Sequence, residues 1–166
     1  MKRLIVLPLI ILMLCGCSKI EKATPIIENI SCVAEIEYNH SNYVCNLELL
    51  NDSLNLKIIE PQEISGLSFL VNKNKITTEY KGIVDAPELN DLPQYLIARI
   101  IFEIINEVKG KTIEFDEHNG IICSEINGYE FGFVFAPSGL PISLSIEDIN
   151  LEIYFKDVSL IQGDLK

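Results

Sequence analysis

The sequence predicts an α+β fold in which a strongly curved antiparallel sheet, an incomplete barrel made of two meanders, is covered by one main helix. Three observations support this prediction: apolar and polar residues alternate in both halves of the chain, turn residues separate the alternating runs, and one helical pattern lies between the halves. Because successive side chains of a strand point to opposite faces, each meander has a single apolar face. Such a face needs a cover, and the helical segment is the element that can supply it.

Length and charge narrow the class of protein. A chain of 166 residues, 48% of them hydrophobic, suits one domain with a substantial core. The 13 Lys and Arg residues against 24 Asp and Glu residues give a net charge of −11, which argues against a nucleic-acid binder that relies on phosphate contacts. No apolar run reaches the ~20 residues that cross a bilayer as a helix.

The N-terminus has the layout of an export signal. Lys2 and Arg3 precede an apolar run at 4–14, which is about half as long as a membrane span and contains Pro8. This layout predicts a signal peptide at 1–16.

The run ends in Leu14-Cys15-Gly16-Cys17, which resembles the lipobox of bacterial lipoproteins. The resemblance implies that the thiol of Cys17 receives a diacylglycerol, and that the signal peptidase recognises Leu14 and Gly16. Anchoring by two acyl chains is stable where one chain is not. It therefore implies a lipoprotein on the extracytoplasmic face of a bacterial cell membrane. An ordinary secretory signal ending in cysteine, or an uncleaved anchor, is the alternative.

Cleavage before Cys17 would leave 11 cations against 24 anions, a charge of −13. Residues 17–30 contain lysines, a proline and little periodicity, so we expect a lipid-anchored tether there and the folded domain at 31–162. Because anionic headgroups repel an acidic domain, we expect the domain to stand off the bilayer.

The first meander is predicted to have five strands. Turns at 39–42 and 51–52 connect the first three, a break follows at 61–66, and strands at 67–71 and 76–80 complete it. The predicted register pairs Tyr38 with Tyr43, Ile36 with Cys45, Leu49 with Leu54, Cys45 with Ile58 and Phe69 with Thr78. All apolar residues then share one face, which a slip of one residue would invert.

A helix is predicted at 92–109. Apolar residues recur there every three or four positions, Asp91 suits the N-cap and Pro93 suits the first turn. Gly110 is expected to end the helix. Its isoleucines lower its intrinsic helix propensity, so packing against the sheet must stabilise it.

The second meander follows the helix. A strand is expected at 111–115, and Asn127-Gly128 is a strong hairpin signal between strands at 122–126 and 129–135. The predicted register pairs Phe133 with Leu144, Phe135 with Ile142, Ile146 with Ile149 across a Glu147-Asp148 turn, and Leu144 with Leu151. The solvent face carries Glu125, Glu130, Ser143, Ser145, Asn150, Glu152 and Lys156.

Three cysteines belong to the expected domain: Cys32, Cys45 and Cys123. The predicted register places Cys45 opposite Ile36, four residues along from Cys32, which corresponds to ~13 Å. A disulfide needs Cα atoms within ~7 Å, so a bridge between Cys32 and Cys45 is disfavoured. We expect all three to be small core residues.

The sequence has no catalytic or metal-binding motif, so we expect no enzyme, no metal and no cofactor. His40 and His118 fall in predicted turns, and neither has a second ligand at metal-binding spacing. The cluster of Glu114, Asp116, Glu117 and His118 suits either a cation site or a solvated strand end.

The layout resembles the lipoprotein-carrier superfamily of bacterial envelopes, which includes LolA, LolB, RseB and LppX. Beside the lipobox, the resemblance rests on the strand order, the segment at 58–67, the helix start Leu92-Pro93 and the loop at 138–141. It implies a half-barrel over roughly residues 31–160, whose open apolar side is plugged by helices. Members usually begin with a longer N-terminal helix, which residues 18–30 are too short to supply.

Two functions remain open. The resemblance and the apolar surplus imply a non-catalytic binding module for a lipid or an acylated peptide. The alternative is an envelope protein-interaction or regulatory module with a filled core, which uses its acidic face to bind a partner. In the first case the ligand would be lined by Ile97, Ile101, Ile104, Ile105, Phe131, Phe133 and Phe135, which otherwise fill the core.

Overall fold

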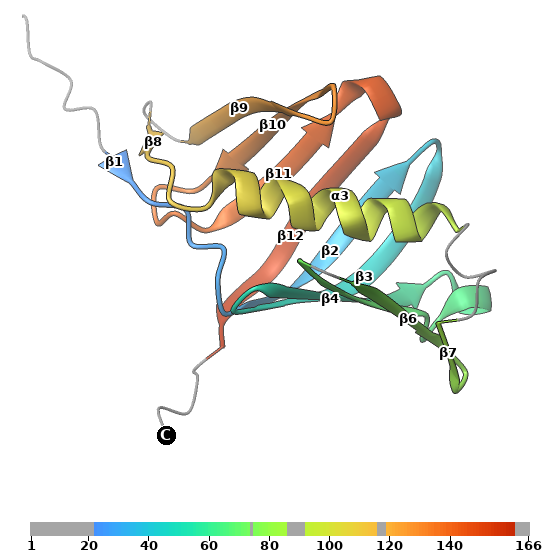
Figure 1. Cartoon of the computed structure of the whole chain (residues 1–166). Helices are drawn as coiled ribbons and strands as arrows, with labels where there is room; N and C mark the ends of the chain where they lie inside the picture. The colour runs from blue at the N-terminus through green and yellow to red at the C-terminus, as the bar shows by residue number, and fades with distance from the viewer. Residues whose placement is uncertain (1–21, 74, 86–91, 116–118, 162–166) are drawn as a thin grey trace, which may run out of the picture.

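The computed structural model describes residues 22–73, 75–85, 92–115 and 119–161. In these residues one helix and twelve strands are formed (Figure 1). They are β1 (Lys22–Ala23), β2 (Ile30–Tyr38), β3 (Ser41–Leu50), β4 (Ser53–Glu60), β5 (Ser68–Asn72), β6 (Ile76–Tyr80), β7 (Ile83–Val84), α3 (Pro93–Val108), β8 (Ile113–Glu114), β9 (Gly120–Ile126), β10 (Tyr129–Phe135), β11 (Pro141–Ile146) and β12 (Leu151–Leu160).

Ten strands form one antiparallel sheet, in the order β7-β6-β5-β4-β3-β2-β12-β11-β10-β9. The pairing of β2 with β12 joins the two predicted meanders and places Ile36 opposite Ile153. The edges of the sheet are β7 and β9, and no pairing between described residues joins them. The predicted α+β class, with a mainly antiparallel, unclosed sheet and one helix, is confirmed.

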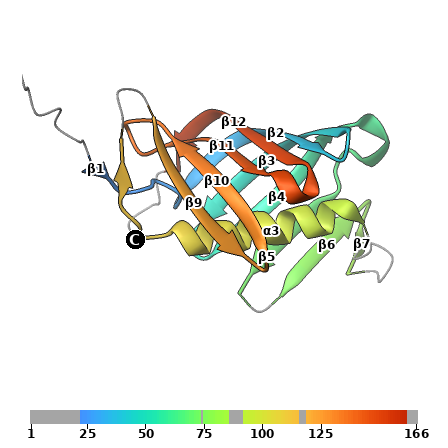
Figure 2. The same cartoon turned by 90° about the horizontal axis from the view of Figure 1, so that it is seen from above.

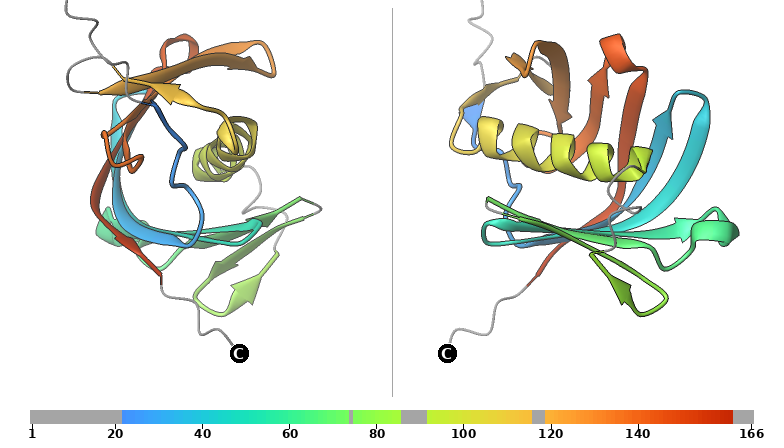
Figure 3. Two further views of the ribbon diagram at one scale, coloured as in Figure 1. Left: turned by 90° about the vertical axis from the view of Figure 1, so that its left-hand side faces the viewer. Right: turned by 45° about the vertical axis from the view of Figure 1, so that its right-hand side comes forward.

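Helix α3 lies across one face of this sheet and contacts both halves of it. It touches β4 and β5 in one half and β9 in the other, and Figures 2 and 3 show strands on more than one side of the helix. The predicted bounds, 92–109, differ from the observed ones by one residue at each end. Gly110 follows the helix with φ +77°, a left-handed conformation that favours glycine. The expected cap Asp91 lies outside the described residues.

The core fills the space between α3 and the sheet. Alternate residues of each strand point into it, as in β4, where Leu54, Leu56 and Ile58 are at most 1% exposed. From the helix, Ile97, Ile101 and Ile104 are also at most 1% exposed. Each such side chain contributes about 1.5–3 kcal/mol when it leaves water, so this layer is what holds the helix to the sheet.

The register predicted for the first hairpin was wrong by two residues. Asn39 and His40 both have positive φ, 47° and 65°, and form a two-residue turn. Such a turn matches the twist of the strands better than the four-residue turn that the sequence suggested. The observed pairs are Tyr38 with Ser41, Ile36 with Tyr43, Ala34 with Cys45 and Cys32 with Leu47. A shift of two residues keeps each side chain on its face, so the predicted apolar face is right although its partners are not.

Two further register predictions need correction. The reversal between β11 and β12 is a short 3-10 turn, η2 (Glu147–Ile149), followed by Asn150 with φ 47°. It pairs Ile146 with Leu151 and Leu144 with Ile153. Between β10 and β11 an irregularity at Val134 and Phe135 places Phe135 opposite Pro141 instead of Ile142.

The other predicted pairs are confirmed. They are Leu49 with Leu54, Cys45 with Ile58, Phe69 with Thr78 and Phe133 with Leu144. Each belongs to a hairpin whose turn or whose apolar face was unambiguous in the sequence.

Part of the segment expected to be a tether packs on the domain. β1 pairs with β8, so the expected strand at 111–115 is a short strand outside the main sheet. The Ile26 N–H donates to the Gly139 carbonyl at 2.8 Å, and Ile27 is 3% exposed. Residues 22–29 therefore lie against the folded part of the chain. A membrane-crossing helix is not found in the described part of the chain.

Candidate functional site: a groove beside helix α3

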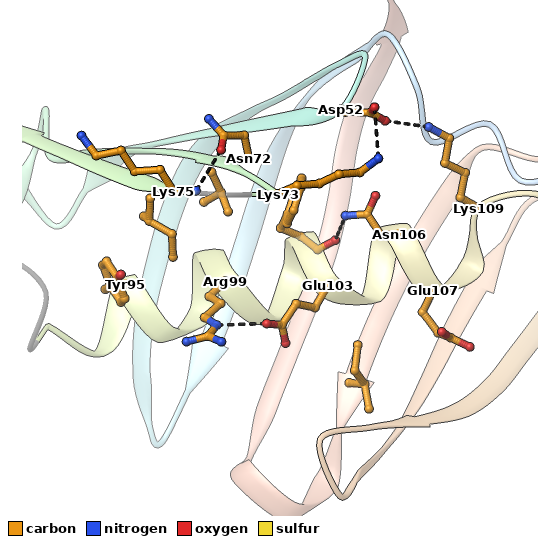
Figure 4. A pocket seen from close by; sticks show the side chains of 14 residues that line it. Asp52, Asn72, Lys73, Lys75, Tyr95, Arg99, Glu103, Asn106, Glu107 and Lys109 are labelled. Atoms are coloured by element: carbon orange, nitrogen blue, oxygen red, sulfur yellow. Dashed lines mark hydrogen bonds and ion pairs between the residues drawn. The ribbon is translucent and has the colours of Figure 1, made fainter.

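A groove of about 900 Å³ runs along one flank of α3 (Figure 4). Its other walls are the β5–β6 hairpin, the β3–β4 turn at Asp52 and Ile126 at the end of β9. Segments far apart in sequence therefore build this site, which we call the α3 groove.

The helix supplies a continuous flank to the α3 groove. Tyr95, Arg99, Phe102, Glu103 and Asn106 line it, and each lies three or four residues from at least one other, the spacing that brings side chains together on one helix face. The buried isoleucines of α3 occupy the neighbouring face and hold this flank in place.

The floor of the α3 groove is apolar. Val71 and Phe102 are 2% and 7% exposed, and Ile76, Tyr95 and Ile126 are partly buried against the same core. The floor is thus the outer surface of the core, reached from the side of the helix.

The rim of the α3 groove carries charges of both signs, and most of them are paired. Arg99 Nε donates to Glu103 Oε1 at 2.9 Å. Asp52 accepts from Lys109 Nζ at 2.9 Å and from Lys73 Nζ at 3.3 Å (Figure 4). Most of these side chains are exposed, so each pair adds little to stability and can open and re-form.

The ion pairs set the acid–base behaviour of the rim. Hydrogen bonds from Lys109 and then Lys73 lower the pKa of Asp52 below its usual value. The hydrogen bonds of Lys109 to Glu28 and Asp52 raise the pKa of Lys109. On the far side of the hairpin, the pKa of Asp85 is lowered by its hydrogen bond from Lys75 and by the backbone N–H of Thr78.

The seven residues predicted to line an apolar ligand lie in the core. Ile97, Ile101, Ile104, Ile105, Phe131, Phe133 and Phe135 are all between 0% and 7% exposed. The structure brings them together in one cluster, with the rings of Phe133 and Phe135 4.4 Å apart between centroids. None of them lines the α3 groove. Their role as ligand lining stays a prediction.

The cysteines divide into two kinds. Cys32 and Cys45 are free and buried, and burial raises the pKa of each thiol to about 12. They are inert core residues, as predicted. Cys123 is also free, but it is exposed, so its predicted place in the core was wrong. Its neighbours Ile122 and Ser124 point inward, and strand alternation turns Cys123 outward.

The other sequence candidates form no metal-binding cluster among the described residues. No group of three or more His, Cys, Asp or Glu side chains there could hold a metal ion. His40 lies in the β2–β3 turn, and Glu114 accepts from Lys22 at 2.7 Å. Asp116, Glu117 and His118, together with Leu14, Gly16 and Cys17, lie outside the described residues.

Comparisons with known proteins give little further information. No protein-family model and no curated protein matches the chain. A crystal structure of the LolA superfamily protein NE2245 from Nitrosomonas europaea matches with a TM-score of 0.36 and 9% sequence identity, over 82% of this chain and 86% of that one. A similarity of this size adds no argument about function.

Proposed function

We propose that this chain is an extracytoplasmic lipoprotein, held on a bacterial cell membrane through Cys17, whose folded part is a non-catalytic binding module for a lipid or an acylated peptide. The lipobox-like sequence at 14–17 supports the anchor. The α3 groove supports the binding role, and it is the observation on which the ligand proposal depends.

The α3 groove suits an amphiphile in size and in chemistry. Its volume of about 900 Å³ lies within the range of small-molecule sites, about 300–1,000 Å³. An acyl chain would cover the floor of Val71, Ile76 and Phe102, while a polar end would meet the charged rim. The exposed ion pairs of the rim can exchange partners with such a polar end at small cost.

The interior beneath α3 offers a second, larger apolar surface to the same ligand. Outward movement of the helix would expose Ile97, Ile101 and Phe133, which the sequence predicted as lining. In this proposal the α3 groove is the entrance, and the core cluster is the surface that a long acyl chain reaches next.

Lipidation is tested by labelling with radioactive palmitate in a bacterial host. The wild-type protein should incorporate label and sediment with membranes, whereas Cys17→Ser should do neither. Cys15→Ser is the matched control, and it should behave as the wild type. Labelled, membrane-bound Cys17→Ser protein would contradict the anchor.

Ligand binding is tested by native mass spectrometry of the protein released from mild detergent. Lipid should remain bound to the wild type, and Ile76→Arg, on the groove floor, should lose most of it. Ile83→Arg is the matched control, since Ile83 lies on β7 with 58% exposure and outside the α3 groove. Spectra of lipid-free wild-type protein in repeated preparations would contradict a lipid ligand.

A second candidate function is an envelope protein-interaction or regulatory module. The observation that favours it is the filled core, since the seven predicted lining residues pack on one another and are at most 7% exposed. In that case a cross-linked partner should be lost when Glu35, Glu48 or Glu125 is changed to Lys, while lipid is absent from the native mass spectra.

A further inference from the structure

The sheet face turned away from α3 is hollowed over β9, β10 and β11. This outer-face hollow encloses about 860 Å³. Many of the residues that line it alternate along the strands with buried ones, as Gly132 does between Phe131 and Phe133, and the inward-facing Ser124 and Phe131 also border it. It shares no lining residue with the α3 groove.

Small residues in one row across three strands form its floor. Gly132 lies opposite Cys123 on β9 and opposite Ser145 on β11. A Cβ added at Gly132 would meet only Ser145 Oγ, at 3.5 Å, which is an ordinary contact. Packing within the chain does not require glycine here, so the space above Gly132 is open to another molecule.

The charged side chains that line the outer-face hollow are all acidic. Glu125, Glu130, Glu147 and Asp148 line it. An adjoining hollow of about 200 Å³ shares Ser145 and Glu147 with it and adds two more, Glu37 and Glu152. Among the residues that the structure describes, no Lys or Arg lines either hollow.

The sheet register sets these carboxylates directly against one another. Glu125 is opposite Glu130, and Glu152 is opposite Glu37. Like charges in such positions destabilise a sheet, and none of these four forms an ion pair with a described Lys or Arg. The pKa of the nearby Tyr154 is raised by its hydrogen bond to Glu152 and by the charges of Glu152 and Glu37. No described Lys or Arg therefore offsets the repulsion between these carboxylates.

An exposed apolar row borders the small-residue floor. In register it runs from Ile121 on β9 through Val134 on β10 and Ser143 on β11 to Tyr154 on β12. Ile121 is 57% and Tyr154 46% exposed. Lys and Arg side chains lay their apolar stems on such surfaces while their charged ends reach carboxylates.

We propose that the outer-face hollow binds an extended, Lys- and Arg-rich segment of another extracytoplasmic protein. The cations of that segment would remove the repulsion between the opposed carboxylates. Its backbone would cross the floor at Gly132, and its apolar stems would cover the row from Ile121 to Tyr154. Binding at this surface does not require a ligand in the α3 groove. It would be the binding site of the second candidate function, the protein-interaction module, and its partner would be a basic segment.

The test is fluorescence anisotropy of labelled decalysine with the full chain in mild non-ionic detergent. The triple variant Glu125→Gln/Glu130→Gln/Glu147→Gln should bind decalysine about tenfold more weakly than the wild type. The matched control is Glu60→Gln/Glu63→Gln/Glu79→Gln, which removes three exposed carboxylates that lie on or beside β4 and β6. It should change the affinity less than about twofold.

Equal losses in the two triple variants would show that net charge alone attracts the probe, and would overturn the proposal. A steric variant gives an independent result, because Gly132→Leu fills the floor without changing charge. Gly132→Leu should weaken binding several-fold and Gly132→Ala should not, while circular dichroism shows both folded. Unchanged binding by folded Gly132→Leu would also overturn the proposal. Neither result depends on lipid, so these failures are distinct from a failure of the ligand proposal.

Discussion

The α3 groove and the outer-face hollow are similar in volume, about 900 and 860 Å³, but they differ in whether their acidic side chains are paired with cations. The α3 groove is lined by four of the nine Lys and Arg residues that the structure describes, and its acidic residues are largely paired with cations. The charged side chains that line the outer-face hollow are all carboxylates. A ligand of the α3 groove must therefore gain most of its binding energy from apolar contact, whereas a partner of the outer-face hollow gains it from charge.

Strand β10 has one face in the core and the other toward the outer-face hollow, and substitutions on these two faces should differ most strongly. Phe133→Ala removes a ring that is 1% exposed and stacks on Phe155 at 5.6 Å, so it should lower the free energy of unfolding by about 3–5 kcal/mol. Gly132→Leu, one residue away on the outer face, should change it by about 1 kcal/mol or less. Urea denaturation followed by circular dichroism measures the free energy of unfolding of both variants. Similar decreases in the two would show that the outer face of β10 is packed within the protein.

Salt should separate the two regions next. The electrostatic screening length falls from about 10 Å at 0.1 M to about 3 Å at 1 M ionic strength. Over this range decalysine should lose about tenfold or more in affinity for the wild type, while the lipid content in native mass spectra stays nearly constant. Glu125→Gln/Glu130→Gln/Glu147→Gln should have a smaller salt dependence. Equal salt dependence of both ligands would remove the distinction between the two regions.

The sequence predicted the faces of the strands better than their partners. Period-two alternation fixes which side chains point inward, and a shift of two residues does not change this. In the first hairpin the predicted apolar face is therefore right, although Ile36 pairs with Tyr43 and not with Cys45. The error came from the turn, since Asn39 and His40 adopt left-handed conformations that tighten the loop to two residues. The residue type of Cys123 suggested a place in the core, whereas its position between the inward-facing Ile122 and Ser124 turns it outward.

The α3 groove could not be predicted in the same way. Its helix flank is visible in the sequence as the polar side of 92–109, which carries Arg99, Glu103 and Asn106. Its other wall depends on the positions of Asp52 and the β5–β6 hairpin. These positions follow from the pairing of β2 with β12 and from the packing of α3 on β4, β5 and β9. Both are long-range contacts between elements whose local patterns allow several partners.

Acid should remove the stabilising effect of Asp52 in the α3 groove. The pKa of Asp52 is lowered by Lys109 and Lys73, so its stabilising effect is present above the ordinary value of 3.8 and is lost as the pH falls through the lowered value. Asp52→Asn should therefore reduce the melting temperature at pH 6, and this difference should shrink when the pH is lowered below about 4. Asp148, in the outer-face hollow, forms no ion pair with a described Lys or Arg, so Asp148→Asn should not reduce the melting temperature at pH 6. Equal reductions in both variants would contradict the assignment.

The smallest expected effect is chemical modification at the floor of the outer-face hollow. Iodoacetamide at pH 8 should alkylate Cys123 in the folded protein and spare Cys32 and Cys45, because burial raises the pKa of both thiols to about 12 and excludes the reagent. Unfolding in urea should expose all three, and peptide mass spectrometry locates the label. Modification at Cys123 should change the free energy of unfolding by no more than about 0.5 kcal/mol, because the side chain already faces solvent. A protected Cys123 would show instead that another molecule, or another copy of the chain, covers this face in solution. Excess decalysine should protect Cys123 from alkylation only if it binds at the same floor.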